Sequence, residues 1–271
     1  MLGAIAFVAL RVETVLVYRW NWAPIPNYLI RWDAARGLVP NLLLQGLATT
    51  LRLSLWGMAL AALLGAIVAV ARISPLLFLR LCGRAYIELM RNTPPLVLIF
   101  VGYFFVASQV MPFLPIDTLA KILPEALIGD PRLLRNFLSA LLVLAMFEAA
   151  YVAEILRAGI ESIERGQWDA GLALGLTRWG LLRRVILPQA ISRMIPPLCG
   201  QFISLVKDSS IVSLVSVQDL TFMANEVAVS SQRVFETWLA TAAIYFAVCF
   251  TLSRLFARFE KPQAARLMPR R

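Results

Sequence analysis

The amino-acid sequence predicts an all-α integral membrane protein with about five core transmembrane helices, preceded by an N-terminal interfacial or additional helix. Three observations carry this prediction. Hydrophobic residues make up 60% of the 271 residues. Five apolar stretches are each long enough to cross the hydrocarbon core of a bilayer, and basic loops alternate with loops of little net positive charge. Because the arginines behind the net charge of +10 lie beside apolar stretches, we expect membrane anchoring and no binding of nucleic acid.

The chain divides into three parts. Residues 1–40 are predicted to form an N-terminal interfacial segment, residues 41–260 a transmembrane domain, and residues 261–271 a cytoplasmic basic tail. No cleavage site follows the first apolar residues, so a cleaved signal peptide is not expected. The aromatic residues between Trp20 and Trp32, spaced by two prolines, indicate an interfacial belt. The predicted spans are Leu42–Ala71, Tyr86–Met111, Asn136–Leu156, Gln189–Lys207 and Thr237–Phe256.

The loop charges predict the orientation. The first and third loops between spans are rich in arginine, the charges of the second cancel, and acidic residues outnumber basic ones in the fourth. The tail after the last span is basic again. Since positively charged loops stay in the cytoplasm, the first span starts outside and the C-terminus lies inside.

Small residues four positions apart predict close helix packing, and prolines predict irregular helices. Gly57, Ala61 and Gly65 form such a seam in the first span. Arg52 in the same span is expected to be structural, because it can extend to the outer surface. Pro196-Pro197 should break or kink the fourth span, and the proline-rich segment 112–131 should hold one short helix.

The stretch Gly166–Pro188 reads as helix, glycine turn, helix. Trp168, Leu172 and Leu176 recur at helical spacing and predict one apolar face. Gly175 suits the position just after a helix end. Thr177 can cap a second helix, which Pro188 closes. A generic amphipathic cytoplasmic loop is the alternative interpretation.

The spacing in this stretch resembles the EAA loop of ABC importer permeases. That pattern is Glu-Ala-Ala, three residues, Gly, nine residues, Ile, one residue, Leu-Pro. Here it reads Asp169-Ala170-Gly171, Gly175, Val185 and Leu187-Pro188, with every interval kept. The words EAAYVAEILRAGI, GQW and RNTP resemble the polar amino-acid branch of the type I importers, and the resemblance covers roughly residues 40–259.

The resemblance implies a role for the loop. Its first helix would be a cytoplasmic coupling helix, which seats in a groove of a separate ATPase subunit. The residues implied in this ATPase coupling are Gly166, Gln167, Trp168, Asp169, Ala170, Gly171, Leu172, Gly175, Leu187 and Pro188.

A second group of residues is expected along the substrate pathway. Glu148 is a carboxylate inside an apolar span, which is costly and usually functional. A carboxylate paired with an arginine or a hydroxyl is the alternative. Lys207-Asp208-Ser209-Ser210 resembles a Lys-Asp-Thr-Ser word of amino-acid permeases, although a neutralising local pair would also explain it. The candidate pathway residues are Glu148, Tyr151, Pro196, Lys207, Asp208 and Ser209.

The resemblance further implies a multi-pass protein of the bacterial inner membrane that works by alternating access. Its partners would be an ABC ATPase dimer, a second permease chain (a heterodimer rather than a homodimer), a periplasmic amino-acid-binding protein, the amino acid and membrane lipid. The sequence has no phosphate-binding Gly-rich loop, so ATP and Mg²⁺ should bind the partner ATPase. No cofactor is expected to bind this chain.

Other classes of protein fit less well. An intramembrane enzyme would need a convergent polar constellation, yet there is no histidine. The three cysteines are far apart, so neither disulfides nor a metal site is expected. A self-contained channel would not need the helix pair, and a secondary transporter would usually show internal repeats.

The small-residue seam Ala145, Ala149 and Ala153 is predicted to contact the second permease chain.

Overall fold

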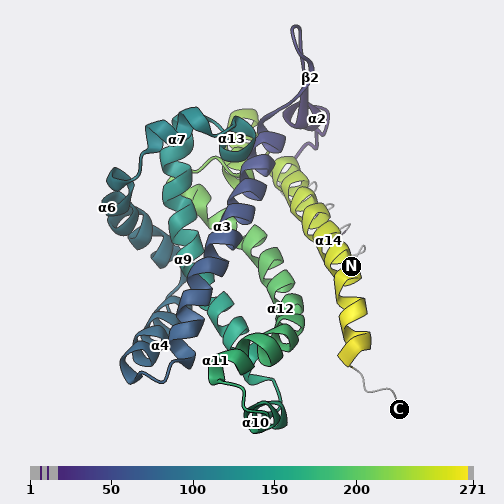
Figure 1. The fold of residues 1–271 in the computed structure, drawn as a ribbon. Helices are drawn as coiled ribbons and strands as arrows, with labels where there is room; N and C mark the ends of the chain where they lie inside the picture. Colours follow the sequence, from purple (N-terminus) through teal and green to yellow (C-terminus); the bar gives the residue numbers. More distant parts are fainter. Residues whose placement is uncertain (1–6, 8–10, 12–17, 268–271) are drawn as a thin grey trace.

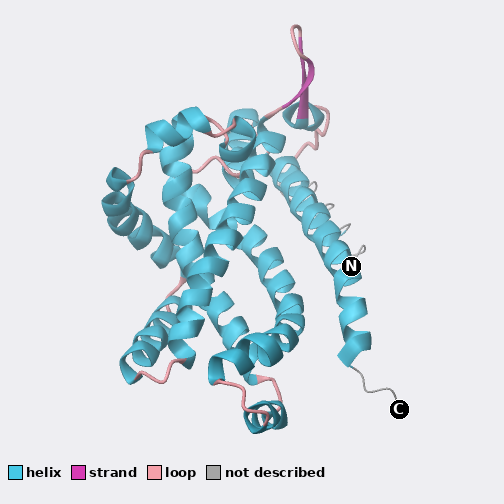
Figure 2. Ribbon diagram, in the orientation of Figure 1, coloured by secondary structure: helices cyan, strands magenta, loops and turns pink. Residues whose placement is uncertain are grey.

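The protein is described by a computed structural model that covers Phe7, Arg11 and residues 18–267, with side chains described as far as Arg258. The helix expected within residues 1–20 and the last residues of the basic tail therefore lie largely outside the described residues. The described chain is helical apart from one hairpin and the connecting loops (Figure 2).

The elements follow one another in a simple order. They are α2 (Ile25–Leu29), β1 (Ile30–Asp33), β2 (Gly37–Pro40), α3 (Leu42–Ile73), α4 (Leu77–Asn92), α5 (Pro95–Val101), the π-helix η1 (Gly102–Ala107), α6 (Ser108–Val110), the 3-10 helix η2 (Met111–Phe113), α7 (Ile116–Ile122), α8 (Glu125–Ile128), the 3-10 helix η3 (Pro131–Leu133), α9 (Leu134–Glu161), α10 (Arg165–Ala173), α11 (Arg178–Leu181), the π-helix η4 (Leu182–Ile186), α12 (Leu187–Asp208), the 3-10 helix η5 (Ser209–Val215), α13 (Leu220–Ser231) and α14 (Val234–Leu267).

Five helical segments of the described residues are long and apolar enough to cross a membrane. This confirms the predicted fold class. The segments are Leu42–Ile73, Pro95–Phe113, Pro131–Glu161, Arg178–Val215 and Val234–Arg258.

The second span begins later than predicted. The apolar pattern suggested Tyr86 as its start, but residues 86–92 belong to the separate helix α4. Thr93 has an extended backbone (ψ 136°), as expected for a residue before proline. Pro94 and Pro95 have no N–H to donate to the preceding turn, so the helix stops and α5 starts afresh at Pro95.

Helix α9 is the centre of the bundle and packs along α3 (Figure 1). Small residues let the two backbones approach closely, since a Cβ at Gly65 would lie 2.8 Å from Cγ1 of Val152. Ala145, Ala149 and Ala153 are fully buried within this chain. The prediction that their seam contacts a second permease chain is therefore wrong, because α3 and α4 already cover it.

Two predicted irregularities take a different form. Helix α12 is continuous across Pro196 and Pro197, so of the predicted break or kink the break is absent. The segment 112–131 holds the short helices α7 and α8 instead of one. Arg52 anchors this segment as a structural residue, because its Nε donates to the carbonyl oxygen of Ala126 at 2.9 Å. Nε1 of Trp56 donates to the carbonyl oxygen of Leu127 at 3.1 Å.

The two ends of the bundle differ. Helices α10 and α11 and the end of α14 lie at one end, while α7, α13 and the β1–β2 hairpin lie at the other (Figure 1). The hairpin, which the sequence pattern did not indicate, is antiparallel and pairs Ile30 with Pro40 and Asp33 with Gly37. In the predicted aromatic belt beside it, the rings of Trp20 and Trp22 stack with their centroids 6.1 Å apart.

The end that carries the hairpin has a buried acidic cap. Oδ1 of Asp219 accepts a hydrogen bond from the backbone N–H of Phe222 at 2.8 Å and so caps α13. Burial raises the pKa of Asp219 from 3.8 to about 6, although the hydrogen bond from Phe222 opposes the shift. The hydroxyl oxygen of Thr50 on α3 accepts from the N–H of Leu220, which fixes α13 to α3.

Candidate functional site

The turn between α10 and α11 has the predicted form. Gly175 has a φ of 76°, which side chains other than glycine rarely tolerate. The N–H of Gly175 donates to the carbonyl oxygen of Leu172 at 2.9 Å, and that of Leu176 to the carbonyl oxygen of Gly171 at 3.1 Å. This is the Schellman arrangement. Oγ1 of Thr177 then accepts from the N–H of Gly180 at 3.2 Å and caps α11.

Helix α10 rests on the bundle through its glycine. Gly171 is buried, and a Cβ there would overlap Cδ1 of Leu181. Trp168 and Leu176 pack on the cluster that contains Leu181. Leu172, by contrast, is 49% exposed. The predicted single face of Trp168, Leu172 and Leu176 is therefore wrong: two of the three residues face inward and one faces outward.

The outward surface of α10 mixes polar and apolar side chains. Leu174 is 82% exposed at the end of the helix, beside the exposed Leu172. The other exposed residues of α10 are Arg165, Gly166, Gln167, Asp169, Ala170 and Ala173. A helix that offers two leucines to the outside at the end of the bundle is suited to contact another protein.

The motif's last two residues do not close a helix. The π-helix η4 connects α11 directly to α12, and Leu187 and Pro188 are the first residues of α12. The expectation that Pro188 closes the second helix is wrong, since the missing N–H of a proline costs little in the first turn. Helix α10 is thus attached to a continuous helix that runs through the bundle to Asp208.

Glu148 lies in a buried polar contact between α9 and α12. Its side chain is fully buried, and Oε2 accepts a hydrogen bond from Nε2 of Gln201 at 2.7 Å. Oε1 has no hydrogen-bond partner among the described residues. Tyr151 lies one turn further along α9, and the guanidinium of Arg91 is 5.4 Å from its ring centroid. On neighbouring turns of α9, Glu148 thus contacts the amide of Gln201 and Tyr151 contacts the guanidinium of Arg91.

Gln201 and Arg91 were not among the candidate residues. An amide inside an apolar span, beside Gly200, is a signal that could have indicated Gln201. Arg91 was counted only among the loop charges, although it lies within the predicted span Tyr86–Met111. It reaches Tyr151 from the end of α4.

Of the other candidate pathway residues, Asp208 is close enough to act electrostatically on Glu148 and Tyr151, whereas Lys207, Ser209 and Pro196 lie elsewhere. Lys207 is exposed and lines a separate groove of about 370 Å³ with Trp238 and Tyr245. The hydroxyl of Ser209 donates to the carbonyl oxygen of Val206 at 2.9 Å, which caps the chain locally. Pro196 lies in the interior of α12. The ion pairs of the described residues do not include a pair between Lys207 and Asp208.

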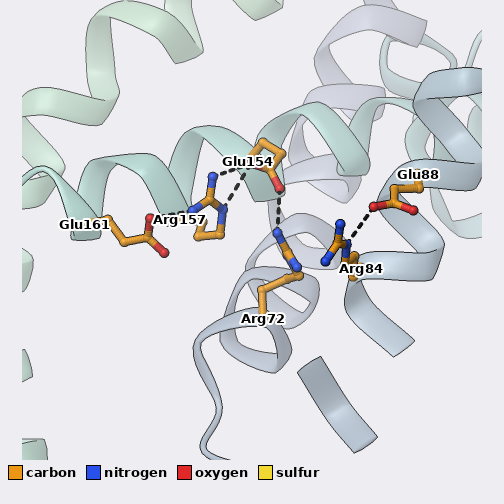
Figure 3. Close-up of polar contacts among 6 residues, drawn as sticks. All are labelled: Arg72, Arg84, Glu88, Glu154, Arg157 and Glu161. Carbon is orange, nitrogen blue, oxygen red and sulfur yellow. Dashed lines mark hydrogen bonds and ion pairs between the residues drawn. The ribbon is translucent and has the colours of Figure 1, made fainter. Parts of the chain in front are cut away.

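A series of ion pairs joins α3 and α9 at the end of the bundle that carries α10 (Figure 3). Glu154 lies 3.4 Å from Nη2 of Arg72 and 2.7 Å from Nη2 of Arg157. Arg157 also pairs with Glu161, one turn further on. Because these side chains are only partly exposed, the series of ion pairs holds the last turn of α9, from which the loop to α10 starts.

A polar cavity of about 940 Å³ opens at the other end of the bundle. It lies between the start of α3 and the segment from α8 to η3. Its charged and amide-bearing lining residues are Gln45, Arg52, Glu125, Asp130, Arg132 and Gln218. This cavity and helix α10 therefore lie at opposite ends of the molecule.

Known proteins share both the sequence and the fold. Residues 61–263 match the family described as binding-protein-dependent transport system inner membrane component. The chain is 34% identical over 230 residues to the glutamine transport system permease protein GlnP of Escherichia coli K12, covering 85% of this chain and 96% of that protein. It is 33% identical over 239 residues to the glutamate/aspartate import permease protein GltK of Escherichia coli O6:H1, covering 88% and 100%.

Solved structures are similar as well. The crystal structure of an amino acid ABC transporter with histidines shares 34% identity, with a TM-score of 0.68 over 82% of this chain and 94% of that chain. An inward-facing structure of the MetNI methionine ABC transporter has a TM-score of 0.54 at 17% identity, which is a likeness of fold alone.

Proposed function

Because the chain belongs to the family of binding-protein-dependent transport system inner membrane components, we propose that it is the permease subunit of an ATP-driven amino-acid importer. The family predicted from the spacing of the loop is thereby confirmed. Relatives named for glutamine and for glutamate and aspartate support an amino acid as the substrate. A periplasmic binding protein delivers it to the polar end of the bundle, and a second permease chain completes the path, in a heterodimer rather than a homodimer.

The observation that carries the proposal is the position of α10. It is bound to the bundle through Gly171 and Leu181, and it turns Leu172 and Leu174 outward at the end of the molecule. An ATPase on a separate chain, which binds ATP and Mg²⁺, would cover these leucines. Its closure would move α10, and the continuous helix η4–α12 would carry the movement to Gln201 and Glu148. ATP and the amino acid then each favour one of two global states of the permease. The switch between these two states is alternating access.

Replacing Leu174 with aspartate is expected to weaken ATPase binding at least about tenfold, because a charge replaces an apolar contact at the centre of an interface. The measurement is co-purification of the ATPase in mild detergent, followed by ATP hydrolysis stimulated by the binding protein and amino acid. For co-purification of the ATPase, Leu38→Asp is the matched control, since Leu38 is 71% exposed in the hairpin at the other end. A lone chain that transports amino acids without an ATPase would refute the proposal and favour a self-contained channel.

The arginines of the coupling loop, residues 166–188, support an orientation in which its end of the bundle, and the C-terminus with it, lies on the cytoplasmic side of the bacterial inner membrane. In a background without the three native cysteines, an impermeant thiol reagent on intact cells should label Glu226→Cys and not Arg184→Cys. Both side chains are exposed in the described chain, so access is limited by the membrane alone. Equal labelling of the two variants from outside would overturn this orientation.

A further inference from the structure

A groove lies beside the coupling loop, on the side of α3 and α4. Its volume is about 1060 Å³. Its walls come from the turn between α3 and α4, the end of α9, and the loop of α10 and α11. Its lining residues are Val70, Ile73, Ser74, Pro75, Arg80, Ile160, Glu161, Ile163, Arg165, Trp168, Arg178, Trp179 and Leu182. The groove therefore separates the coupling loop from α4, and both lie at the same end of the bundle (Figure 1).

The groove has an excess of positive charge. Arg80, Arg165 and Arg178 line it from three different elements. The ion pairs of the described residues include none of these three arginines. The one carboxylate in the lining, Glu161, is already paired with Arg157. Three guanidinium groups without a protein counter-charge around one space favour an anion, and their planar donors suit phosphate.

The surroundings of the groove are apolar. Val70 is 65% exposed at its edge on α3, and the neighbouring turn exposes Leu77 and Phe78 to 59% and 75%. Trp179 is 68% exposed. Helix α4 exposes leucines together with arginines, as interfacial helices do, and tryptophan is typical of the headgroup level of a membrane. A free anion would use only the arginines of this arrangement, whereas a lipid would use both the arginines and the apolar edge.

We propose that this groove binds an anionic phospholipid of the inner leaflet, with the headgroup phosphate between Arg80, Arg165 and Arg178. The acyl chains lie against Val70 and the exposed side of α3, and Trp179 covers the glycerol region. The bound lipid lies between α4 and the loop of α10 and α11, both of which line the groove. The assignment to the inner leaflet rests on the proposed orientation of the permease, whereas binding itself does not depend on transport.

The test uses the full permease complex in phosphatidylcholine micelles, titrated with phosphatidylglycerol that carries brominated acyl chains. Bromine should quench Trp179, and the signal is the difference between the wild type and Trp179→Phe. Native mass spectrometry counts the phosphatidylglycerol retained. Since one basic residue near an anionic membrane surface is worth about fivefold in affinity, the double variant of Arg165→Gln and Arg178→Gln should bind about thirtyfold more weakly. Arg80→Gln alone should lose about fivefold, which shows that α4 takes part.

The control is the double variant of Arg183→Gln and Arg184→Gln, which removes the same charge from the same loop but from residues outside the groove. It should retain the lipid. Equal losses in the two double variants would overturn the site, as would equal quenching by brominated phosphatidylcholine. Full competition by inorganic phosphate would assign the groove to free phosphate, and loss of lipid whenever the ATPase is bound would make it part of the ATPase interface. Either result would refute the lipid proposal.

Discussion

Replacing Gly171 with valine is expected to uncouple the permease from its ATPase. A Cβ at this position would overlap the side chain of Leu181, so α10 must shift away from the bundle. Inserting methyl groups into such a packed contact costs about 1–3 kcal/mol. The carbonyl oxygen of Gly171 also accepts the hydrogen bond from Leu176 that closes the turn, so the shift disturbs the cap. We expect retention of the ATPase to fall at least about tenfold, measured by co-purification.

Two companion variants make this result specific. Gly200→Val adds the same side chain at another helical glycine with no neighbour within 4 Å, outside the loop of α10 and α11, and it should leave ATPase binding unchanged. Removing the obstacle should restore function, so Gly171→Ala combined with Leu181→Ala should bind the ATPase better than Gly171→Ala alone. If Gly171→Val binds the ATPase like the wild type, α10 is not positioned by this contact.

The turn between α10 and α11 could be predicted from the sequence because its geometry depends on single residues. A positive φ at Gly175 and a hydroxyl cap at Thr177 follow from the chemistry of those residues, wherever they lie in the fold. The inward and outward faces of α10 were harder to predict. Leu172 and Trp168 are equally apolar in a helical pattern, and only the position of Leu181 decides which of them is covered.

The small-residue seam of α9 shows another limit of the sequence. Alanines four residues apart predict that some backbone comes close, but they do not say which one. In this bundle α9 is central, so α3 and α4 take the surface that was expected to face a second chain. The misplaced start of the second span has a simpler cause. Hydropathy alone does not register Pro94 and Pro95, although the rule for residues before proline already indicates a break there.

The substrate pathway was predicted only in part. Glu148 was identified because a carboxylate in an apolar span is costly, and it is fully buried. Tyr151 lies one turn further along α9, where its ring contacts Arg91. Lys207 and Ser209 were predicted only from the resemblance to a short motif of amino-acid permeases, and they lie elsewhere. Lys207 lines a groove beside α14, and the hydroxyl of Ser209 donates to the carbonyl oxygen of Val206. A role of Lys207 and Ser209 in transport remains a prediction. The proposed substrate pathway is tested more directly by a variant of Glu148.

Glu148→Gln is expected to leave assembly intact and abolish most of the transport. The side-chain carbonyl of glutamine can accept the same hydrogen bond from Gln201 that Oε2 accepts now, so shape and packing are kept. What is lost is the charge, whose second oxygen has no partner among the described residues. Since a charged group inside an apolar span costs ~2.5–3.5 kcal/mol on insertion scales, such an unpartnered oxygen indicates a partner that arrives during transport. The ammonium group of an amino acid is such a partner.

A hydrogen bond to a charged group contributes about 1.5–3 kcal/mol, so uptake stimulated by the binding protein should fall at least about tenfold. Binding of the ATPase and the amount of protein in the membrane should be unchanged. The control is Glu88→Gln, which removes a carboxylate that pairs with Arg84 on the exposed side of α4. The uptake that Glu148→Gln retains should show altered selectivity between cationic and anionic amino acids. Glu148→Asp keeps the charge and should retain part of the wild-type uptake. If Glu148→Gln carries every amino acid at the wild-type rate, Glu148 only packs α9 against α12 and the substrate takes another path.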